Sequence, residues 1–126
     1  MNFPDNLKYT NDHEWLKVEG NIGIVGVTDH AQGELGDVVY IDIPDRTDSF
    51  NAGDVIGTIE AVKTVADILS PISGKLIEIN KDLNDKPEAV NQDPYGEGWM
   101  LKIEFSNPSE IDSLMDTETY KQLIGN

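Results

Sequence analysis

Residues 54–69 read DVIGTIEAVKTVADIL, two short runs of apolar and β-branched residues on either side of Lys63. Gly53 precedes the first run and Ser70-Pro71 follows the second, and residues of these types commonly bound strands. The pattern predicts a hairpin over about 54–69 with Lys63 at its turn. A primary amine that rigid strands hold in place can be acylated, which removes its charge and tethers the added group. Most surface lysines are only solvated charges, so spacing alone does not assign a modification.

Alternation of apolar and polar residues dominates the first hundred positions and predicts a mainly β fold. Strands are expected over 13–18 and 22–27, with a hairpin turn at Glu19-Gly20-Asn21, because Gly and Asn tolerate positive φ. Thr28 is expected to cap a short helix that ends near Gly36.

The segments that follow predict a further strand, a loop and another strand. Val39, Ile41 and Ile43 are expected to share one face of a strand. Residues 75–79 predict another strand, whereas 81–94 is polar, contains two prolines and predicts a loop with a helical turn.

The pattern changes near the carboxyl end of the chain. Trp99, Leu101, Ile103 and Phe105 alternate as in a strand, and helical spacing follows. Asn107 is expected to cap the first helical turn, with Glu110 completing a capping box. One or two helices are therefore predicted over about 108–124, packed against the sheets.

Several motifs in register resemble one known family. The hairpin, with Glu60, Lys63 and Asp67 followed by Ser70-Pro71-Ile72-Ser73-Gly74, resembles the lipoyl-lysine hairpin of the glycine cleavage system H proteins. The family's order and approximate spacing are matched by Tyr9-Thr10, His13-Glu14-Trp15, Gly26-Val27-Thr28-Asp29-His30-Ala31-Gln32, Leu35-Gly36-Asp37-Val38-Val39, Pro94-Tyr95 and Gly98-Trp99-Met100. The resemblance covers nearly the whole chain. It departs from the family at Ala61 and Ala66, where serine is common.

The resemblance implies a fold and a function. The fold is a small barrel-like β sandwich of the lipoyl/biotinyl-domain type, with short peripheral helices and a C-terminal helical segment. The function is that of a non-catalytic carrier with lipoate joined by an amide to Lys63. The arm would take an aminomethyl group from the glycine decarboxylase (P protein) to the aminomethyltransferase (T protein). Dihydrolipoamide dehydrogenase (L protein) would reoxidise it, and a lipoate-attaching enzyme would load it.

Three carboxylates are candidates for contact with the arm or its enzymes. Glu14 and Asp67 lie in motifs that match the family, and carboxylates could hold the amine of a loaded arm by charge-assisted hydrogen bonds. Glu14 has a second interpretation, as an exposed position of an alternating strand. Glu60 is a candidate for recognition by the lipoate-attaching enzyme, or else a solvated strand residue.

The sequence leaves two other functions open and disfavours a third. An octanoyl or lipoyl relay donor to other lipoyl proteins stays open, and so does a small hydrolase, although the sequence offers no nucleophile and base pair. Biotin carriers place methionines beside the lysine, where this chain has Val62 and Thr64. His13 and His30, 17 positions apart in a chain without cysteine, predict structural hydrogen bonds and no metal site.

Composition limits the partners and the compartment. The chain of 126 residues predicts a single domain, 1–126, and a monomer is expected. Nine Lys and Arg against 24 Asp and Glu give a formal charge of −15, which disfavours nucleic acid and anionic membranes and favours protein partners. No apolar run is long enough to span a bilayer. The amino terminus has no secretory signal pattern, so a bacterial cytoplasm is expected, or a mitochondrion for a processed eukaryotic form.

Overall fold

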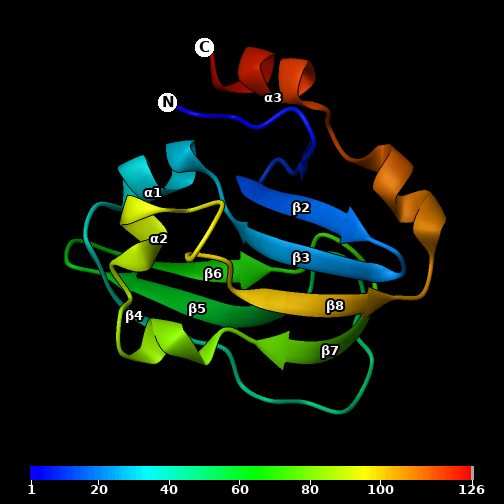
Figure 1. The fold of residues 1–126 in the computed structure, drawn as a ribbon, viewed down its shortest axis with the longest axis horizontal. Coiled ribbons are helices and arrows are strands. Elements are labelled where there is room, and N and C mark those ends of the chain that lie inside the picture. Colours follow the sequence, from blue (N-terminus) through cyan, green and yellow to red (C-terminus); the bar gives the residue numbers. More distant parts are fainter. Residues whose placement is uncertain (126) are drawn as a thin grey trace.

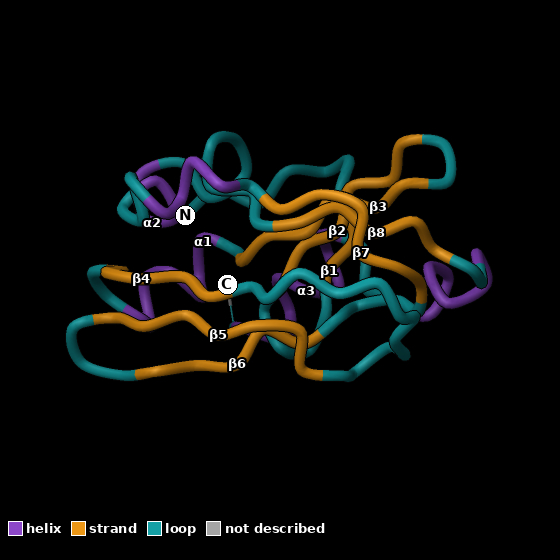
Figure 2. The backbone as a smooth tube through the Cα atoms, turned by 90° about the horizontal axis from the view of Figure 1, so that it is seen from below, coloured by secondary structure: helices purple, strands orange, loops and turns teal. Residues whose placement is uncertain are grey.

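Two antiparallel sheets form the body of the protein, in a computed structural model that describes residues 1–125 (Figure 1). The larger sheet has the strand order β1-β2-β3-β8-β7, and the smaller has the order β4-β5-β6. Figure 2 shows the two layers from below. The strands are β1 Lys8–Tyr9, β2 Glu14–Glu19, β3 Ile22–Val27, β4 Val38–Asp42, β5 Val55–Ala61, β6 Val65–Leu69, β7 Gly74–Ile79 and β8 Leu101–Phe105. The predicted mainly β sandwich with short peripheral helices is confirmed.

Short helices surround the sandwich. They are α1 Asp29–Leu35, η1 Lys81–Asn84, α2 Ala89–Gln92, η2 Pro108–Ser113 and α3 Thr117–Ile124, where η denotes a 3₁₀ helix. α1 begins as predicted, because the Thr28 hydroxyl accepts a hydrogen bond from the Ala31 N–H at 3.1 Å. α1 and α2 lie next to one another at one end of the sandwich (Figure 1).

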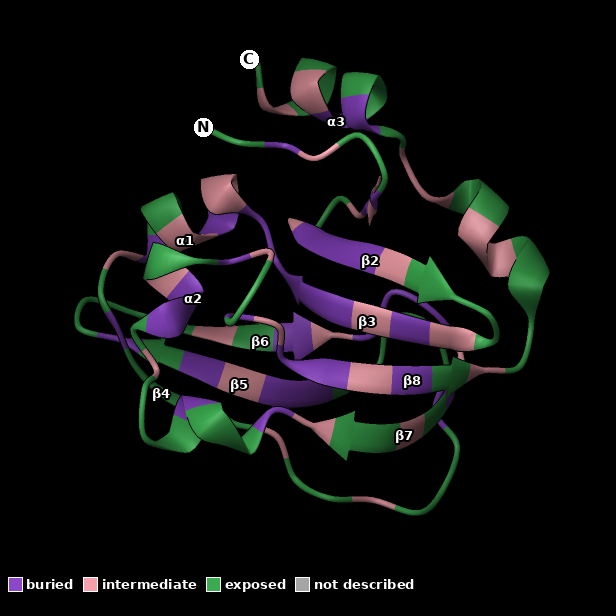
Figure 3. Ribbon diagram, viewed as in Figure 1, coloured by how far each residue is buried: buried purple, intermediate pink, exposed green. Residues whose placement is uncertain are grey.

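The main core lies between the two sheets. Side chains that alternate inward from β5, β6 and β8 meet there, and Figure 3 shows buried and more exposed positions alternating along β8. Ile59, Ile68 and Ile103 are almost completely buried. Burying an aliphatic side chain of this size stabilises the fold by about 1.5–3 kcal/mol, so this layer supplies much of the folding free energy.

A second, aromatic cluster fixes α3 to the larger sheet. Tyr120 of α3 stacks on Tyr9 with ring centroids 4.7 Å apart. Its hydroxyl lies 2.9 Å from His13 Nδ1 and 2.8 Å from the Thr28 hydroxyl. Burial, and then the nearby His30, hold the pKa of His13 below its ordinary value, which favours a neutral ring beside Tyr120. The structural role predicted for His13 is confirmed, and His30 lies 3.5 Å from Glu34.

Two of the predicted details are wrong. Val39 does not share a buried face with Ile41, because the register between β4 and β5 shifts between Val38 and Tyr40; Val38 and Ile41 are buried and Val39 is exposed. The extra residue of such a bulge turns the following side chains over. Glu110 does not close a capping box, since its carboxylate accepts hydrogen bonds from the Ser73 N–H and hydroxyl, each at 2.8 Å.

The carboxyl-terminal segment forms two helices, which agrees with the one or two predicted over about 108–124. Asn107 does cap, accepting a bond from the Ser109 N–H, but it caps the 3₁₀ helix η2. α3 follows after a break, with the Asp116 side chain at its start. In the segment 81–94 the structure has two helical turns, η1 and α2, where one was predicted. Among the described residues, no helix combines the length and the apolar character needed to cross a membrane.

Candidate functional site

Lys63 lies at the tip of the hairpin formed by β5 and β6, as predicted. Ile59 pairs with Ala66 and Glu60 with Val65, and the turn closes with a hydrogen bond of 2.8 Å from the Ala61 N–H to the Thr64 carbonyl. Lys63 itself is exposed to solvent. The paired strands therefore fix the root of a long, accessible amine-bearing side chain.

The hairpin tip rests on the loop that follows α1. The Val62 N–H donates to the Asp37 carbonyl at 2.9 Å. Gly36, the residue after α1, has φ 75° and lies against the lysine stem: a Cβ built on Gly36 would be 3.2 Å from Lys63 Cε. Glycine is favoured here for its backbone conformation, whereas the nearby end of the exposed lysine side chain could move aside for a Cβ.

Glu14 is a buried carboxyl, with 3% of its surface exposed, so its interpretation as an exposed strand position is wrong. Its Oε2 accepts a hydrogen bond of 2.8 Å from the Leu69 N–H, and its Oε1 accepts one of 3.4 Å from the Thr10 hydroxyl. Burial raises the pKa of Glu14 to about 8, while the bond from Leu69 acts in the opposite direction. At neutral pH the protonated form is therefore the main one in the structure as it stands.

Asp67 and Glu60 are exposed positions on the outer face of the smaller sheet. Across the strands, Asp67 aligns with Thr58 and Asp42, and Glu60 aligns with Val65 and Tyr40. Between them, buried Ile59 and partly buried Ala66 face the core, which places both carboxylates on the solvent side.

β6 connects these parts of the site. Lys63 precedes its first residue, Val65, and Glu14 binds its last residue, Leu69. At a rise of about 3.3 Å per residue, Val65 and Leu69 lie about 13 Å apart, so Lys63 and Glu14 are not in contact. Asp67 lies between them on the same strand. β6 is the last strand of its sheet, and its second edge, which Glu14 binds, carries no paired strand among the described residues.

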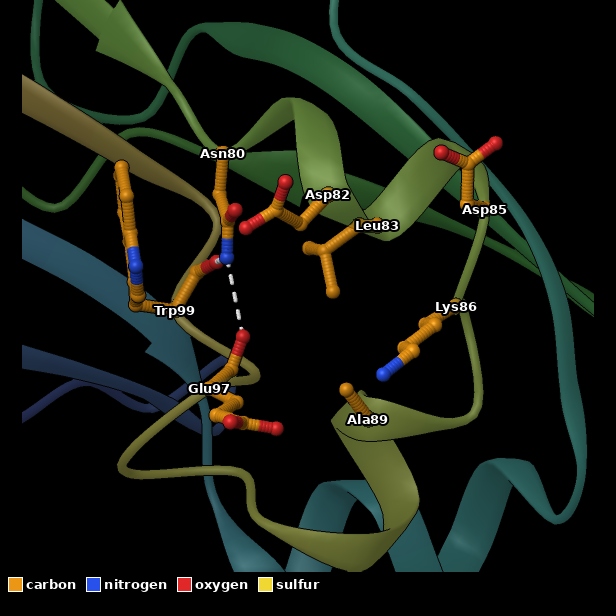
Figure 4. A pocket seen from close by; sticks show the side chains of 8 residues that line it. All are labelled: Asn80, Asp82, Leu83, Asp85, Lys86, Ala89, Glu97 and Trp99. Carbon is orange, nitrogen blue, oxygen red and sulfur yellow. Dashed lines mark hydrogen bonds between the residues drawn. The ribbon is translucent and has the colours of Figure 1, made fainter.

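Lys63 lines neither of two cavities on the molecule. One of about 360 Å³ lies between η1, α2 and the segment before β8, lined by Asn80, Leu83 and Trp99 among others (Figure 4). The amide of Asn80 at its edge donates to the Glu97 carbonyl at 2.9 Å. A smaller cavity of about 240 Å³ borders Glu14 and Thr10. None of the predicted site residues except Glu14 lines either one, so the accessible amine and not a cavity defines the site.

Sequence reasoning missed the residues that support the hairpin tip. Gly36 was recognised only as the end of a helix, and Asp37 only as part of a matching motif. Asn91 was not singled out, although its side chain binds the Gly36 carbonyl and the Val38 N–H. Its partners are more than 50 positions away in the sequence. No local pattern of the chain reports such a contact.

A β sandwich that presents one exposed lysine at the tip of a hairpin has the form expected of a carrier protein for a covalently attached group. The comparisons with known proteins identify which carrier this is. A family model described as glycine cleavage H-protein matches residues 7–126. The chain therefore belongs to the glycine cleavage H-protein family.

Known H proteins are similar to this chain over nearly its full length. The chain is 50% identical over 124 residues to the glycine cleavage system H protein of Bacteroides fragilis, and 51% identical over 124 residues to that of Bacteroides thetaiotaomicron. Each alignment covers 98% of both chains. The crystal structure of a glycine cleavage system H protein from Mycobacterium marinum superimposes with a TM-score of 0.89 at 32% identity, covering 98% of this chain and 100% of that one.

Family membership gives the protein its general role. It is a lipoyl carrier of the glycine cleavage system, and it is a carrier and not an enzyme. Members carry the lipoyl group on a lysine. The P, T and L proteins of the system are its partners.

Proposed function

We propose that Lys63 is the lysine that carries the lipoyl group. The observation that supports this most directly is its place at the exposed tip of the β5–β6 hairpin, on a turn closed by the Ala61–Thr64 hydrogen bond. The lipoyl group supplies a disulfide that can open to accept a one-carbon amine unit and later be reformed. The residues of this chain hold the root of that group and leave its far end free to reach successive enzymes, which keeps it at a high local concentration.

The pinned turn fixes where the arm starts. Val62 is bound to the Asp37 carbonyl, and the lysine stem passes over Gly36. An arm rooted here can lie along β6 toward Glu14, because Lys63 and Glu14 are at opposite ends of that strand. Fixing one end reduces the number of positions that the other end explores.

Glu14 and Asp67 are proposed to hold the amine of the loaded arm. Glu14 is buried with a pKa of about 8, so it is mostly protonated at neutral pH before a cation arrives. A positive charge beside it favours the carboxylate, and Glu14 would then release its proton and accept a charge-assisted hydrogen bond. Asp67 lies two residues before Leu69 on β6, about 7 Å along the strand, and offers a second carboxylate on the solvent side.

Glu60 is proposed to contact the enzyme that attaches lipoate. It lies three residues before Lys63, on the outer face between Tyr40 and Val65. Tyr40 and Val65 are 49% and 61% exposed, so Glu60 lies between two apolar side chains that a partner could cover. An enzyme that forms the amide must cover the hairpin tip, whereas enzymes acting on the far end of the arm need not.

The oligomeric state and the cellular compartment of the protein are part of the same proposal. We propose that it acts as a monomer, since a carrier must present one arm to several enzymes in turn. The relatives at 50% and 51% identity come from bacteria, and this supports the cytoplasm of a bacterium as its compartment.

Intact-mass analysis with peptide mapping tests the central assignment. In the protein purified from its own cells, we expect one lipoyl adduct, on Lys63. Lys63→Arg keeps the charge and should abolish both the adduct and glycine-dependent loading, while Lys75→Arg serves as a matched control and should change neither. An adduct on another lysine, or an unmodified Lys63 that the attaching enzyme fails to modify in vitro, would refute the proposal.

A further inference from the structure

Asn91, in α2, makes three hydrogen bonds with one side chain. Its Oδ1 accepts from the Val38 N–H at 2.9 Å, and its Nδ2 donates to the Gly36 carbonyl at 2.8 Å and to the Gln32 side-chain oxygen at 3.1 Å. The first two partners are the backbone groups on either side of Asp37. One amide thus fixes the two peptide groups that flank a single residue.

That residue supports the lysine turn. The Asp37 carbonyl accepts the Val62 N–H at 2.9 Å, and Gly36 lies under the lysine stem. A chain of direct contacts therefore runs from Asn91 through residues 36–38 to Val62 and Lys63. The three hydrogen bonds of the Asn91 side chain go to neither of these last two residues.

Asn91 is itself held firmly. The preceding residue, Val90, is completely buried in the main core, and the Asn91 N–H donates to the Glu88 carbonyl at 3.0 Å. The loop at 36–38 has no regular pairing until β4 begins at Val38. Packing of Val90 in the core thus fixes α2, and the hydrogen bonds of the Asn91 amide attach the loop to α2.

The chemistry of the contact requires an amide. An acceptor and a donor must lie side by side to bind an N–H and a carbonyl together, and the asparagine side chain has this arrangement. Aspartate would keep the acceptor but place a second oxygen against the Gly36 carbonyl. Alanine would remove both bonds.

We propose that Asn91 is a positioning residue for Lys63, holding the 36–38 loop so that the hairpin tip, and with it the root of the arm, stays in one place. The proposal rests on Lys63 as the attachment lysine. If the tip moves, only a fraction of molecules presents the lysine correctly, and the apparent affinity of an enzyme for the tip falls by that fraction.

Amide hydrogen exchange measures the position of the tip directly, in the unmodified protein. In Asn91→Ala we expect exchange at Val62 to be about tenfold faster or more, and exchange at Ile59 in the core to be unchanged, because only the local opening is altered. Gln32→Ala is the matched control. It removes the one Asn91 contact that does not bind the loop backbone, and Val62 should exchange within about twofold of the wild-type rate.

Loading by the lipoate-attaching enzyme gives the functional readout. We expect Asn91→Ala to raise the KM for the protein about five- to tenfold with kcat unchanged, and Gln32→Ala to leave both near wild type. Asn91→Asp should act in the same direction as Asn91→Ala, and it replaces that variant if the alanine protein does not fold.

The outcomes separate the two proposals. Wild-type exchange at Val62 and a wild-type KM in a folded Asn91 variant would overturn the role of Asn91. Failure of the wild-type protein to be lipoylated at Lys63 would overturn the proposed function, while the exchange data would still decide whether Asn91 holds the tip.

Discussion

Glu14 is a single carboxyl whose burial links stability to pH. Its folded-state pKa of about 8 lies above its ordinary value of 4.5, so the folded protein binds this proton more tightly than the unfolded chain does. The stability that results is fully present below about pH 4.5 and is lost as the pH rises through about 8. Deprotonation leaves a buried charge, which lowers the free energy of unfolding.

Glu14→Gln should therefore remove most of this pH dependence. At about 1.4 kcal/mol for each unit of pKa shift, and after loss of part of the Leu69 bond, we expect the variant to be more stable than wild type by about 1–3 kcal/mol at pH 9 and similar to it near pH 5. Urea unfolding at both pH values measures the difference. If the free energy of unfolding changed equally in the two proteins between pH 5 and pH 9, the argument that Glu14 is destabilising when ionised and buried would be contradicted.

The carboxylates along β6 lead to a prediction about the loaded arm. If Glu14 and Asp67 hold the amine, Glu14→Gln with Asp67→Asn should speed loss of the aminomethyl group by about three- to tenfold, because charge-assisted bonds are lost. The decay of the loaded protein, followed by mass, gives the rate. Asp42→Asn is a matched control, since Asp42 lies in the same row of the outer face but on β4. An unchanged lifetime in the double variant would rule out this contact.

For single residues, the sequence predicted which side chain is the candidate attachment site, but not how buried or how bonded the other side chains are. Lys63 could be found because it lies between two alternating runs and because its motif resembles a family. The buried environment of Glu14 could not be predicted, since its backbone partner Leu69 lies 55 positions away in the sequence. The role of Asn91 was hidden for the same reason. Contacts across the fold set the pKa of one residue and the function of the other.

The loop between α1 and β4 is the element that supports the site, and Gly36 sets its shape. At φ 75° and ψ −156°, an alanine is strained by about 1–3 kcal/mol, and its Cβ would crowd Lys63 Cε. We expect Gly36→Ala to destabilise the protein by about this amount. Gly33, inside α1, has no heavy atom near its would-be Cβ, and Gly33→Ala should stabilise by about 0.5–1 kcal/mol. Urea unfolding of the two variants compares them, and equal stabilities would be inconsistent with the strain.

Elements were predictable where local rules govern them. The alternation of β5 and β6 and the Thr28 cap of α1 act over a few residues, and both are confirmed. The bulge in β4 was not predictable, because one extra residue is accommodated only by pairing with β5. Glu110 likewise leaves its own helix to bind Ser73 on another segment, so its helix lacks the expected capping box.

The molecule as a whole contains two packed clusters, and we propose that residues 1–126 fold as one domain. The clusters are joined through β2 and β3, since Leu16 belongs to the main core and its neighbour Trp15 to the aromatic cluster. The Tyr120 hydroxyl further attaches α3 to the body of the protein through its hydrogen bonds with His13 and Thr28. Unfolding followed by tryptophan fluorescence and by far-UV circular dichroism should give coincident transitions. Two separate midpoints would show that the aromatic cluster and α3 unfold independently.

The net charge of −15 is a property of the whole chain that bears on every partner. Its field should speed association with basic surfaces around partner active sites and be screened as salt is added. For reoxidation of the lipoylated protein by dihydrolipoamide dehydrogenase, we expect kcat/KM to fall severalfold between about 0.05 and 0.5 M salt, as the screening length shortens to a few Å. A rate independent of salt would mean that the acidic surface serves solubility alone.

Two pairs of substitutions separate a local effect from the total charge. Glu60→Gln with Asp37→Asn neutralises two exposed carboxylates close to the hairpin tip, and Asp5→Asn with Asp112→Asn neutralises two exposed carboxylates in other segments. Each pair changes the net charge equally. If the field near Lys63 guides the encounter, the first pair should lower kcat/KM at low salt by about two- to fivefold and the second should have little effect, because the influence of an exposed charge fades beyond a screening length of about 10 Å. Equal losses would assign the steering to the net charge, and the position of the lysine within the acidic surface would then be irrelevant to how fast its partners arrive.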